Sequence, residues 1–306
     1  MLNPARVRSY QHLTAGDLVP PTSPRVFFEP ADTETGVWVA RDLITDGCSV
    51  LDLGAGSGAA AAAMARAGAA RVHGIDSGRE TVAWAAEHYA SPGGDPRVTI
   101  AHADFARLTT EELLATAPAP LPRPLVVTSN PPYVPLAERA DARRPSISGG
   151  PDGLKWAPAI IGHARALDSD LGLTIASYST PRRAVHLLRD AGYRVRGITL
   201  CPLPLGEFTL RHLERILALE QSGEAVLWRR PDDLTPAYFI LGLACRRAHR
   251  HPDVPDPTGD DLMRLLRTAA RSRTTRLETL DAPRQITHHV PLRVLDLPAA
   301  TVRTHW

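Results

Sequence analysis

Short apolar runs alternate with helix-like segments along the first half of the chain. CSVLDL, RVHGID, RVTIAH and PLVVTS are predicted to be strands, and each of the first three leads into a segment of helical character. The clearest of these segments is AAAAAMARAGAA, because alanine has the highest intrinsic helix propensity. Strands that alternate with helices form a mostly parallel sheet with helices on both faces. The pattern therefore predicts a Rossmann-like α/β fold.

The alternation of strands and helices continues to residue 246, which sets the expected limits of the main domain at residues 46–246. Residues 201–235 lie between the last two predicted strands, and their length indicates a helical insertion. Residues 1–45 carry few periodic signals and are predicted to form an irregular segment or lid. Residues 247–306 form a C-terminal extension, in which GDDLMRLLRTAARSRTTRL predicts an amphipathic helix.

Composition and charge narrow the class of protein. The formal net charge of +2 at pH 7 gives no strong bias toward nucleic acid or anionic membranes. Cys48, Cys201 and Cys245 are too scattered for a metal site or a disulfide framework, which fits a reducing compartment. We find no secretion signal and no apolar run of membrane-spanning length. We therefore expect a cytoplasmic protein without a metal centre or a membrane partner.

A glycine-rich turn after the first predicted strand is the first sign of a ligand site. LDLGAGSGA places Gly54, Gly56 and Gly58 between strand and helix, where glycine permits a tight turn and close approach of a ligand. Asp52 lies near the end of this strand, and Asp76 ends the next one. A carboxylate at that position can accept both hydroxyl hydrogens of a ribose. Ligands of parallel sheets bind at these carboxyl ends.

Two cofactors fit the glycine turn. The string satisfies G-x-G-x-x-A, a pattern of nicotinamide dinucleotide sites. S-adenosylmethionine (SAM) is the alternative, since it contains adenosine but no pyrophosphate. HADF after the third predicted strand favours SAM, because Asp104 could accept a hydrogen bond from the adenine amino group and Phe105 could cover the ring.

The fourth predicted strand ends in TSNPPY, residues 128–133. Prolines alone would end a strand, so Asn130 and Tyr133 need another explanation. An amide, aniline-like or guanidino nitrogen has a delocalised lone pair and attacks a sulfonium methyl group only when its hydrogens are held. The Asn130 side chain and the Pro131 backbone carbonyl would accept those hydrogens, while Pro131 and Pro132 fix the backbone. Tyr133 would offer an aromatic face to the substrate.

In this order, VLDLGAGSG, GID, HADF and NPPY resemble the class I SAM-dependent methyltransferases that act on nitrogen. SISGGPDGL, residues 146–154, is similar to the G-G-x-D-G-L segment that follows NPPY in the HemK/PrmC-type protein-glutamine methyltransferases. VFFEPADTE, residues 26–34, resembles the I-P-R-P-x-T-E segment of that family. The resemblance extends over residues 26–200.

This resemblance implies a seven-stranded class I methyltransferase sheet, with SAM as methyl donor and S-adenosylhomocysteine as product. It implies that Asn130, Pro131 and Tyr133 hold the acceptor nitrogen during catalysis. The implied cofactor-binding residues are Thr33, Asp52, Gly54, Gly56, Asp76, Ser77, Asp104, Phe105 and Asn130.

The chain departs from this family where the family recognises its substrate. Few residues precede Val26, so there is little room for a release-factor-binding helical domain, and the arginine of I-P-R-P is missing. SYS, residues 177–179, stands where the fifth strand of the family usually ends near E-H-G. We therefore expect the acceptor to be a small molecule or an amino acid of specialised metabolism.

Other acceptors and classes stay open. A protein glutamine is one alternative, and a DNA or RNA base is another, although acids offset the arginines of the C-terminal extension. A non-catalytic scaffold or a nicotinamide oxidoreductase would leave NPPY unexplained. The arginine-rich extension could also be a homodimer contact.

A cationic guanidino acceptor would need a nearby carboxylate to orient it and help remove a proton. The candidates for this role are Glu29, Asp152 and Glu207. Pro132 and Tyr133 complete the predicted substrate site.

Overall fold

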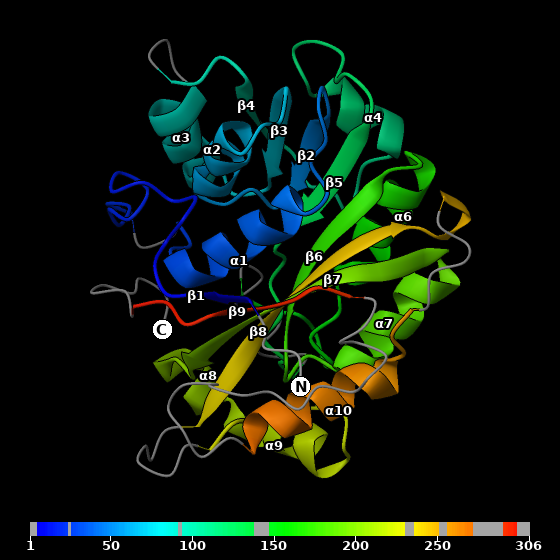
Figure 1. Ribbon diagram of the computed structural model, residues 1–306. Helices are drawn as coiled ribbons and strands as arrows, with labels where there is room; N and C mark the ends of the chain where they lie inside the picture. Colours follow the sequence, from blue (N-terminus) through cyan, green and yellow to red (C-terminus); the bar gives the residue numbers. More distant parts are fainter. Residues whose placement is uncertain are drawn as a thin grey trace.

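A mixed sheet runs through the molecule and collects strands from both ends of the described chain (Figure 1). The computed structural model describes residues 5–23, 26–90, 94–137, 147–229, 236–250, 256–271 and 290–298. The strands are β1 (Ala5–Val7), β2 (Ser49–Leu53), β3 (Arg71–Asp76), β4 (Val98–His102), β5 (Leu125–Ser129), β6 (Asp170–Ala176), β7 (Tyr193–Pro204), β8 (Ala237–Arg247) and β9 (Leu292–Leu295). Within the described ranges, the nine strands follow the order β1-β9-β7-β8-β6-β5-β2-β3-β4.

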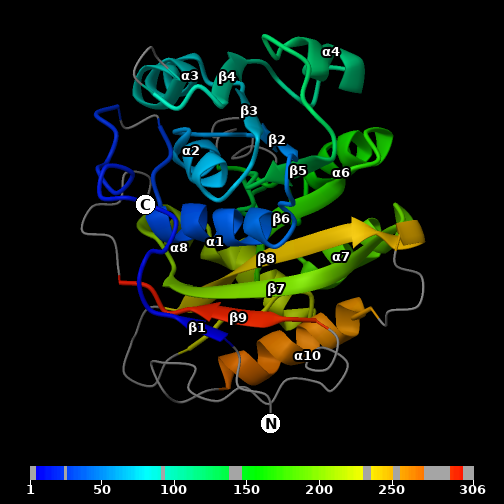
Figure 2. The ribbon, with the colours of Figure 1, turned by 45° about the horizontal axis from the view of Figure 1, so that its top comes forward.

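The predicted α/β class is confirmed, but the expectation of seven strands is wrong. Strands β4, β3, β2, β5 and β6 are parallel, and β8 is antiparallel to both of its neighbours, β6 and β7. Beyond β7 the sheet continues through β9 and β1 in parallel pairing, and Figure 2 shows these two strands side by side. The 12 residues of β7 would otherwise present a long unpaired edge, which β9 partly covers.

Helices lie on both faces of the sheet (Figure 1). They are α1 (Pro30–Arg41), α2 (Ala59–Arg66), α3 (Arg79–Ala85), α4 (Thr110–Ala115), α6 (Ala157–Ala166), α7 (Pro181–Asp190), α8 (Glu207–Arg211), α9 (Leu213–Gln221) and α10 (Gly259–Ala270), with a π turn at Ala86–Ala90 and a 3-10 turn at Ala248–Arg250. Helices α8 and α9 lie within the predicted insertion at residues 201–235, whose first residues continue β7. None of the helices in the described ranges has the length and apolar content that crossing a membrane requires.

Helices α3 and α4 begin at different kinds of N-cap. Gly78 rather than Ser77 is the N-cap of α3, and no side chain caps that helix. Thr109 rather than Thr110 caps α4, because its hydroxyl accepts a hydrogen bond from the backbone N–H of Glu112 at 3.2 Å. The Glu112 carboxylate in turn accepts a hydrogen bond from the backbone N–H of Thr109 at 2.8 Å, which completes a capping box.

Helix α1 lies within residues 1–45, so the expectation of an irregular segment is wrong for Pro30–Arg41. Its buried residues include Asp32, Glu34 and Thr35, which hide the apolar period that marks most packed helices. Glu34 is satisfied by backbone N–H groups of an earlier segment, including that of Leu13 at 3.1 Å. A buried polar face, held by hydrogen bonds to other parts of the chain, therefore explains why the pattern predicted no helix.

Two glycines let α1 approach the sheet closely. A Cβ at Gly242 of β8 would lie 2.3 Å from the Val39 side chain of α1, and one at Gly172 of β6 would lie 2.9 Å from it. Such distances are too short for real side-chain contacts, so both positions need glycine. The close approach brings the first turn of α1 to the carboxyl ends of the parallel strands.

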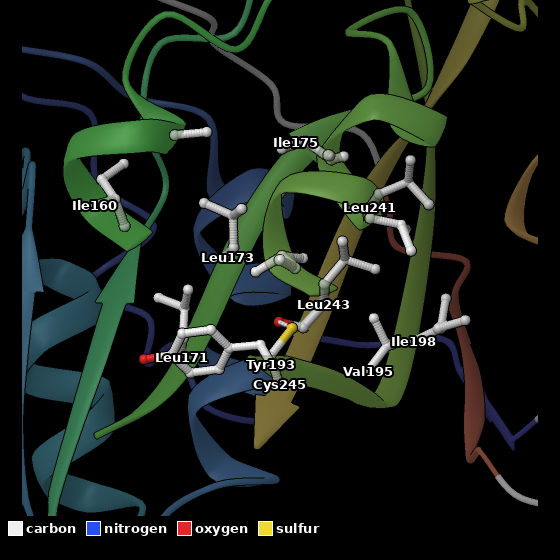
Figure 3. Close-up of a cluster of buried hydrophobic side chains, with 14 of the residues drawn as sticks. Ile160, Leu171, Leu173, Ile175, Tyr193, Val195, Ile198, Leu241, Leu243 and Cys245 are labelled. Carbon is white, nitrogen blue, oxygen red and sulfur yellow. Dashed lines mark hydrogen bonds between the residues drawn. The ribbon is translucent and has the colours of Figure 1, made fainter. Parts of the chain in front are cut away.

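The opposite face of the sheet carries a core of aliphatic side chains. Figure 3 shows Leu171, Leu173 and Ile175 of β6 with Leu241 and Leu243 of β8, all of which are 1% exposed or less. Helix α10 belongs to this core through its buried apolar face, and it confirms the amphipathic helix predicted near residue 260. Burying one such aliphatic side chain stabilises the fold by about 1.5–3 kcal/mol. This rigid layer holds the strand ends that form the site.

Candidate active site

A cavity of about 940 Å³ opens at the carboxyl ends of β2, β3 and β5, beside the first turn of α1. This is the edge at which parallel sheets bind ligands. Most of the predicted site residues meet there. Those in the cavity wall are Thr33, Asp52, Gly54, Gly56, Asp76, Ser77, Asp104, Phe105, Asn130, Pro131, Pro132 and Tyr133.

The glycine turn between β2 and α2 depends on positive φ angles. These angles are 81° at Gly54, 57° at Gly56 and 84° at Gly58. Residues with a side chain rarely adopt this region. The backbone N–H of Gly54 donates to the carbonyl of Ile75 at 2.8 Å, which ties the turn to β3. A Cβ at Gly58 would lie 3.0 Å from the Tyr89 ring, so glycine also makes room for the neighbouring helix.

The carboxylate of Asp76 is held by two backbone amides. Its Oδ2 accepts from the N–H of Gly56 at 3.0 Å, and its Oδ1 accepts from the N–H of Gly78 at 2.8 Å. Burial raises the pKa of Asp76, while these two hydrogen bonds act in the opposite direction. Each carboxylate oxygen keeps further acceptor capacity, so the group can accept the ribose hydroxyls that the sequence predicted.

Asp52 is a second buried carboxyl group at this end of the cavity. Its Oδ1 accepts a hydrogen bond from the Thr128 hydroxyl at 2.8 Å. Burial raises the pKa of Asp52 to about 6, the Thr128 hydroxyl opposes the shift, and the charge of Asp76 adds to it. A cationic ligand nearby would therefore keep Asp52 ionised.

Asp104 and Phe105 form another part of the wall. Asp104 pairs with Arg107 at 3.1 Å and is partly exposed. The Phe105 ring meets Trp156 edge-on, with 6.0 Å between ring centroids. The backbone of Phe105 is fixed by His163, whose Nε2 lies 2.9 Å from the Phe105 carbonyl oxygen. This histidine therefore supports the segment.

Asn130 lies directly after β5. The hydroxyl of its neighbour Ser129 donates to the carbonyl of Leu53 at 2.6 Å, which fixes the end of β5 against β2. The side-chain oxygen Oδ1 of Asn130 is buried and has no hydrogen-bond partner among the described residues. A buried acceptor left unsatisfied costs about 1–3 kcal/mol. A ligand that donates a hydrogen bond there would recover this energy.

Asp32 of α1 was missed by sequence reasoning, and it contacts the predicted Tyr133. The Tyr133 hydroxyl donates to Asp32 Oδ2 at 2.6 Å, and both side chains are buried. Burial raises the pKa of Asp32 to about 7, although Tyr133 and Asn130 lower it by hydrogen bonding. Its Oδ1 is buried without a hydrogen-bond partner within the described ranges. In the sequence, the only signal was its place at the variable position of the P-x-T-E pattern.

The G-G-x-D-G-L segment packs against the NPPY loop. A Cβ at Gly149 would lie 2.7 Å from the Cα of Tyr133, and one at Gly153 would lie 2.7 Å from the Tyr133 carbonyl oxygen. That carbonyl accepts a hydrogen bond from the Ser179 hydroxyl at 2.8 Å. The glycines are therefore needed for close packing, which fixes the position of Tyr133.

The three acids predicted to meet the substrate do not belong to the described cavity wall. Glu29 is buried as the N-cap of α1. Asp152 pairs with Arg183, and Glu207 of α8 pairs with Arg211 on the surface. Local partners and helix capping account for these side chains. Nor do the described residues bring together three His, Cys, Asp or Glu side chains that could hold a metal ion.

Asp52, Asp76 and Asp104 line one end of the cavity, called the cofactor end below. Comparison with known proteins concerns this part of the chain. Residues 50–115 match a family model described as "Methyltransferase domain". This segment runs from β2 to α4 and includes the glycine turn and Asp76, although it is less than half of the chain. No curated protein sequence matches the chain. The match supports a methyltransferase of the SAM-dependent class and leaves the methyl acceptor open.

Several solved methyltransferase structures are similar to this chain at low identity. A Pyrococcus horikoshii protein described as an RNA methyltransferase aligns with a TM-score of 0.45 and 15% identity, over 75% of this chain and 91% of its own. The precorrin-6y C5,15-methyltransferase of Geobacter metallireducens gives 0.41 and 15%, over 76% and 98%. A geranyl diphosphate methyltransferase, solved with the SAM analogue sinefungin, gives 0.41 and 11%, over 71% and 78%. TM-scores below 0.5 at these identities support no inference about the fold or the function of this chain.

Proposed function

We propose that this protein is a SAM-dependent N-methyltransferase whose acceptor is a planar nitrogen of a small molecule. The unpartnered Oδ1 of Asn130 in the cavity wall carries this proposal. An oxygen acceptor at this place suits an N–H group, because it can hold a hydrogen of an amide, amine or guanidino nitrogen while the lone pair stays available. A hydroxyl acceptor would offer one hydrogen only, and a carbon acceptor would offer no comparable donor.

The residues of the cofactor end fit SAM. Asp76, already oriented by two amides, suits the ribose hydroxyls, and Phe105 suits the adenine ring. Asp52 is a buried carboxyl group that a ligand cation would stabilise. When bound, SAM supplies an electrophilic methyl group on a sulfonium centre.

Asn130 would contribute by holding the acceptor rather than by removing a proton. Its Oδ1 accepts one N–H of the substrate and so turns the nitrogen lone pair toward the methyl group. The hydrogen bond from Ser129 to Leu53 and the fixed φ angles of Pro131 and Pro132 limit movement of this loop. Holding the reacting nitrogen in one orientation is the largest contribution that an uncharged amide can make.

The depth of the acceptor end supports a small acceptor. Tyr133 is 5% exposed and Asp32 is 1% exposed, so a polymer would have to insert a side chain or a flipped base through the cavity. The volume of about 940 Å³ is large for a ligand pocket and leaves space for a second compact molecule beside SAM. Phe27, Val134 and Ile147 add apolar surface to the wall for the body of that molecule.

Transfer of a labelled methyl group tests this function. The protein and methyl-labelled SAM would be added to a dialysed cell extract and, separately, to its small-molecule filtrate. We expect label in the filtrate, and none when Asn130→Ala replaces the wild type. Label that protease treatment removes would favour the glutamine alternative, and label that nuclease treatment removes would favour a base. Equal labelling by Asn130→Ala would contradict the role of Asn130.

A further inference from the structure

The acceptor end of the cavity contains two buried oxygens that lack hydrogen-bond partners among the described residues. One is Oδ1 of Asn130, and the other is Oδ1 of Asp32. Both residues line the cavity, and Asp32 is joined through its Oδ2 to the hydroxyl of Tyr133 at 2.6 Å. The NPPY loop and the first turn of α1 therefore bring an amide oxygen and a carboxylate oxygen, both without partners among the described residues, to the same end of the cavity.

The Asp32 carboxyl group lacks the compensation that buried acids usually have. It forms no ion pair with any described residue, and the side chains that hydrogen-bond to it, Tyr133 and Asn130, are both neutral. A buried carboxylate is tolerated when a cation or several donors satisfy it. Asp32 therefore favours a ligand that brings positive charge together with an N–H donor.

The other acids of the cavity already have partners. Asp76 accepts from two backbone amides, Asp52 accepts from Thr128, Asp104 pairs with Arg107, and Glu80 accepts from the Ser23 hydroxyl. The first three belong to the cofactor end. Among the described acids of the wall, Asp32 is the one that adjoins Asn130 and Tyr133. It is therefore the carboxyl group best placed to meet the methyl acceptor.

We propose that the methyl acceptor is an amidine-type cation, an N–C–N group with hydrogens on both nitrogens, which Asn130 and Asp32 hold together. Asn130 accepts from the nitrogen that is methylated, and Asp32 accepts from the second nitrogen. Guanidino and amidino compounds have this planar, two-nitrogen geometry. This proposal rests on the proposed N-methyltransferase function and names the substrate class of the same site.

The same arrangement provides a path for the proton that the reaction releases. An N–H bond of the cationic acceptor breaks, and an O–H bond forms on Asp32, so the acceptor becomes neutral. The nitrogen lone pair then forms the new N–CH₃ bond while the S–CH₃ bond breaks and leaves its electron pair on sulfur. The methylated nitrogen then loses one hydrogen to solvent, and the second nitrogen recovers the proton from Asp32. The products are a methylated amidinium, S-adenosylhomocysteine and one released proton. Positive charge is conserved, and no other reactant is needed.

A carboxamide acceptor would fit an ionised Asp32 poorly. Its NH₂ group could donate to Asn130, but its carbonyl oxygen would then face the Asp32 carboxylate, and both of these groups are acceptors. Two facing acceptors repel each other and leave both unsatisfied. An amidinium replaces that carbonyl oxygen by a donor, so the matched pair of benzamidine and benzamide isolates this one difference.

Binding of these two probes tests the proposal without relying on turnover. Each would be titrated calorimetrically into the protein at pH 8 with saturating sinefungin, which occupies the acids of the cofactor end. We expect benzamidine to bind at least about tenfold more tightly than benzamide, as a charge-assisted hydrogen bond allows. Asp32→Asn should reduce this preference to less than about threefold, while Glu214→Gln, an exposed acid-to-amide change on α9, should leave it unchanged.

The outcomes separate the two proposals. If sinefungin fails to bind the wild type, the SAM-dependent function itself is wrong. If sinefungin binds but the wild type prefers benzamide, binds both probes equally or binds neither, the amidine proposal is overturned. A preference that Asp32→Asn retains also overturns it, because another acid would then be responsible. Sinefungin affinity and the melting temperature of Asp32→Asn show whether that variant is folded, and the wild-type ratio is decisive without it.

Discussion

The two ends of the cavity differ in whether their polar side chains already have hydrogen-bond partners in the protein. At the cofactor end, Asp76 and Asp52 already accept hydrogen bonds from the protein. At the acceptor end, Asn130 and Asp32 each keep a buried oxygen without a partner among the described residues. A satisfied carboxylate is pre-oriented for one ligand, whereas an unsatisfied acceptor favours any ligand that donates the missing hydrogen bond. From this comparison we expect the choice of the methyl acceptor to depend on the unpaired oxygens.

Replacing Asn130 by alanine should have the largest effect on turnover. The variant removes the acceptor that holds the reacting nitrogen, so kcat/KM should fall by about 10³-fold or more, as is typical when a positioning group is lost. The rate of label transfer from methyl-labelled SAM measures this change. A loss of less than about tenfold would show that Asn130 is not the main group that holds the reacting nitrogen.

Replacing Asp76 by alanine should affect the cofactor end instead. The KM for SAM should rise by about 100-fold, because two charge-assisted hydrogen bonds to the ribose are lost. At saturating SAM, kcat should return to within a few-fold of the wild-type value. Initial rates over a range of SAM concentrations separate the two constants. A lower kcat with unchanged KM would contradict the ribose assignment.

Gly153→Ala should damage the acceptor end through packing alone. Its Cβ would lie 2.5 Å from the Ser179 Cβ and 2.7 Å from the Tyr133 carbonyl oxygen, at a φ of +82°. We expect a loss of about 1–3 kcal/mol in the free energy of unfolding and a displaced NPPY loop. Gly162→Ala is the matched control, because a Cβ at that position of α6 meets nothing within 4 Å. Denaturant unfolding of both variants checks the difference, and equal stabilities would refute the packing role.

The pH dependence should reveal the Asp32 carboxyl group. Burial raises the pKa of Asp32 to about 7, so the ligand-free protein gains the carboxylate as the pH rises through that value. For a cationic acceptor, kcat/KM should increase about tenfold per pH unit below pH 7 and level off above it. The groups that face Asp32 are Glu29, the N-cap of α1, and the tyrosines at 133, 178 and 238. Burial raises the pKa values of these three tyrosines away from this range. If this increase of kcat/KM below pH 7 is lost in Asp32→Asn, the titrating group is Asp32 rather than Glu29.

The effect of Asp32 on stability has the opposite sign. An acid whose pKa is raised by folding binds more protons in the folded state than in the unfolded state. Its contribution to the free energy of unfolding is therefore present below the unfolded pKa of about 4 and is lost as the pH rises toward 7. Urea unfolding between pH 4 and pH 8 should show a smaller decrease for Asp32→Asn than for the wild type. An identical decrease would mean that Asp32 keeps an ordinary pKa.

The sequence predicted the cofactor end better than the acceptor end for a physical reason. Gly54, Gly56 and Asp76 lie on one strand–turn–helix unit and its neighbouring strand, so their spacing along the chain reflects their spacing in space. Asp32 reaches the site only because α1 packs on Gly172 and Gly242, far along the chain. Contacts of this kind depend on tertiary packing, which a local pattern does not record.

The edge strands illustrate the same limit. The other seven strands follow from apolar segments that alternate with helical ones. In contrast, β1 and β9, at one side of the sheet, are 3 and 4 residues long and carry no clear period. Their pairing with each other and with the edge of β7 defines them as strands.

The acids Glu29, Asp152 and Glu207 are candidates by residue type alone, and local partners or helix capping explain their positions better.

Titration of sinefungin into three proteins tests the division of the cavity most directly. Wild type, Asn130→Ala and Asp76→Ala would be compared by isothermal calorimetry at one pH, with melting temperatures as a check of folding. We expect Asn130→Ala to bind within about threefold of the wild type, and Asp76→Ala to bind about 100-fold more weakly. If Asn130→Ala loses as much affinity as Asp76→Ala, or if Asp76→Ala binds as well as the wild type, the cavity does not have separate cofactor and acceptor ends.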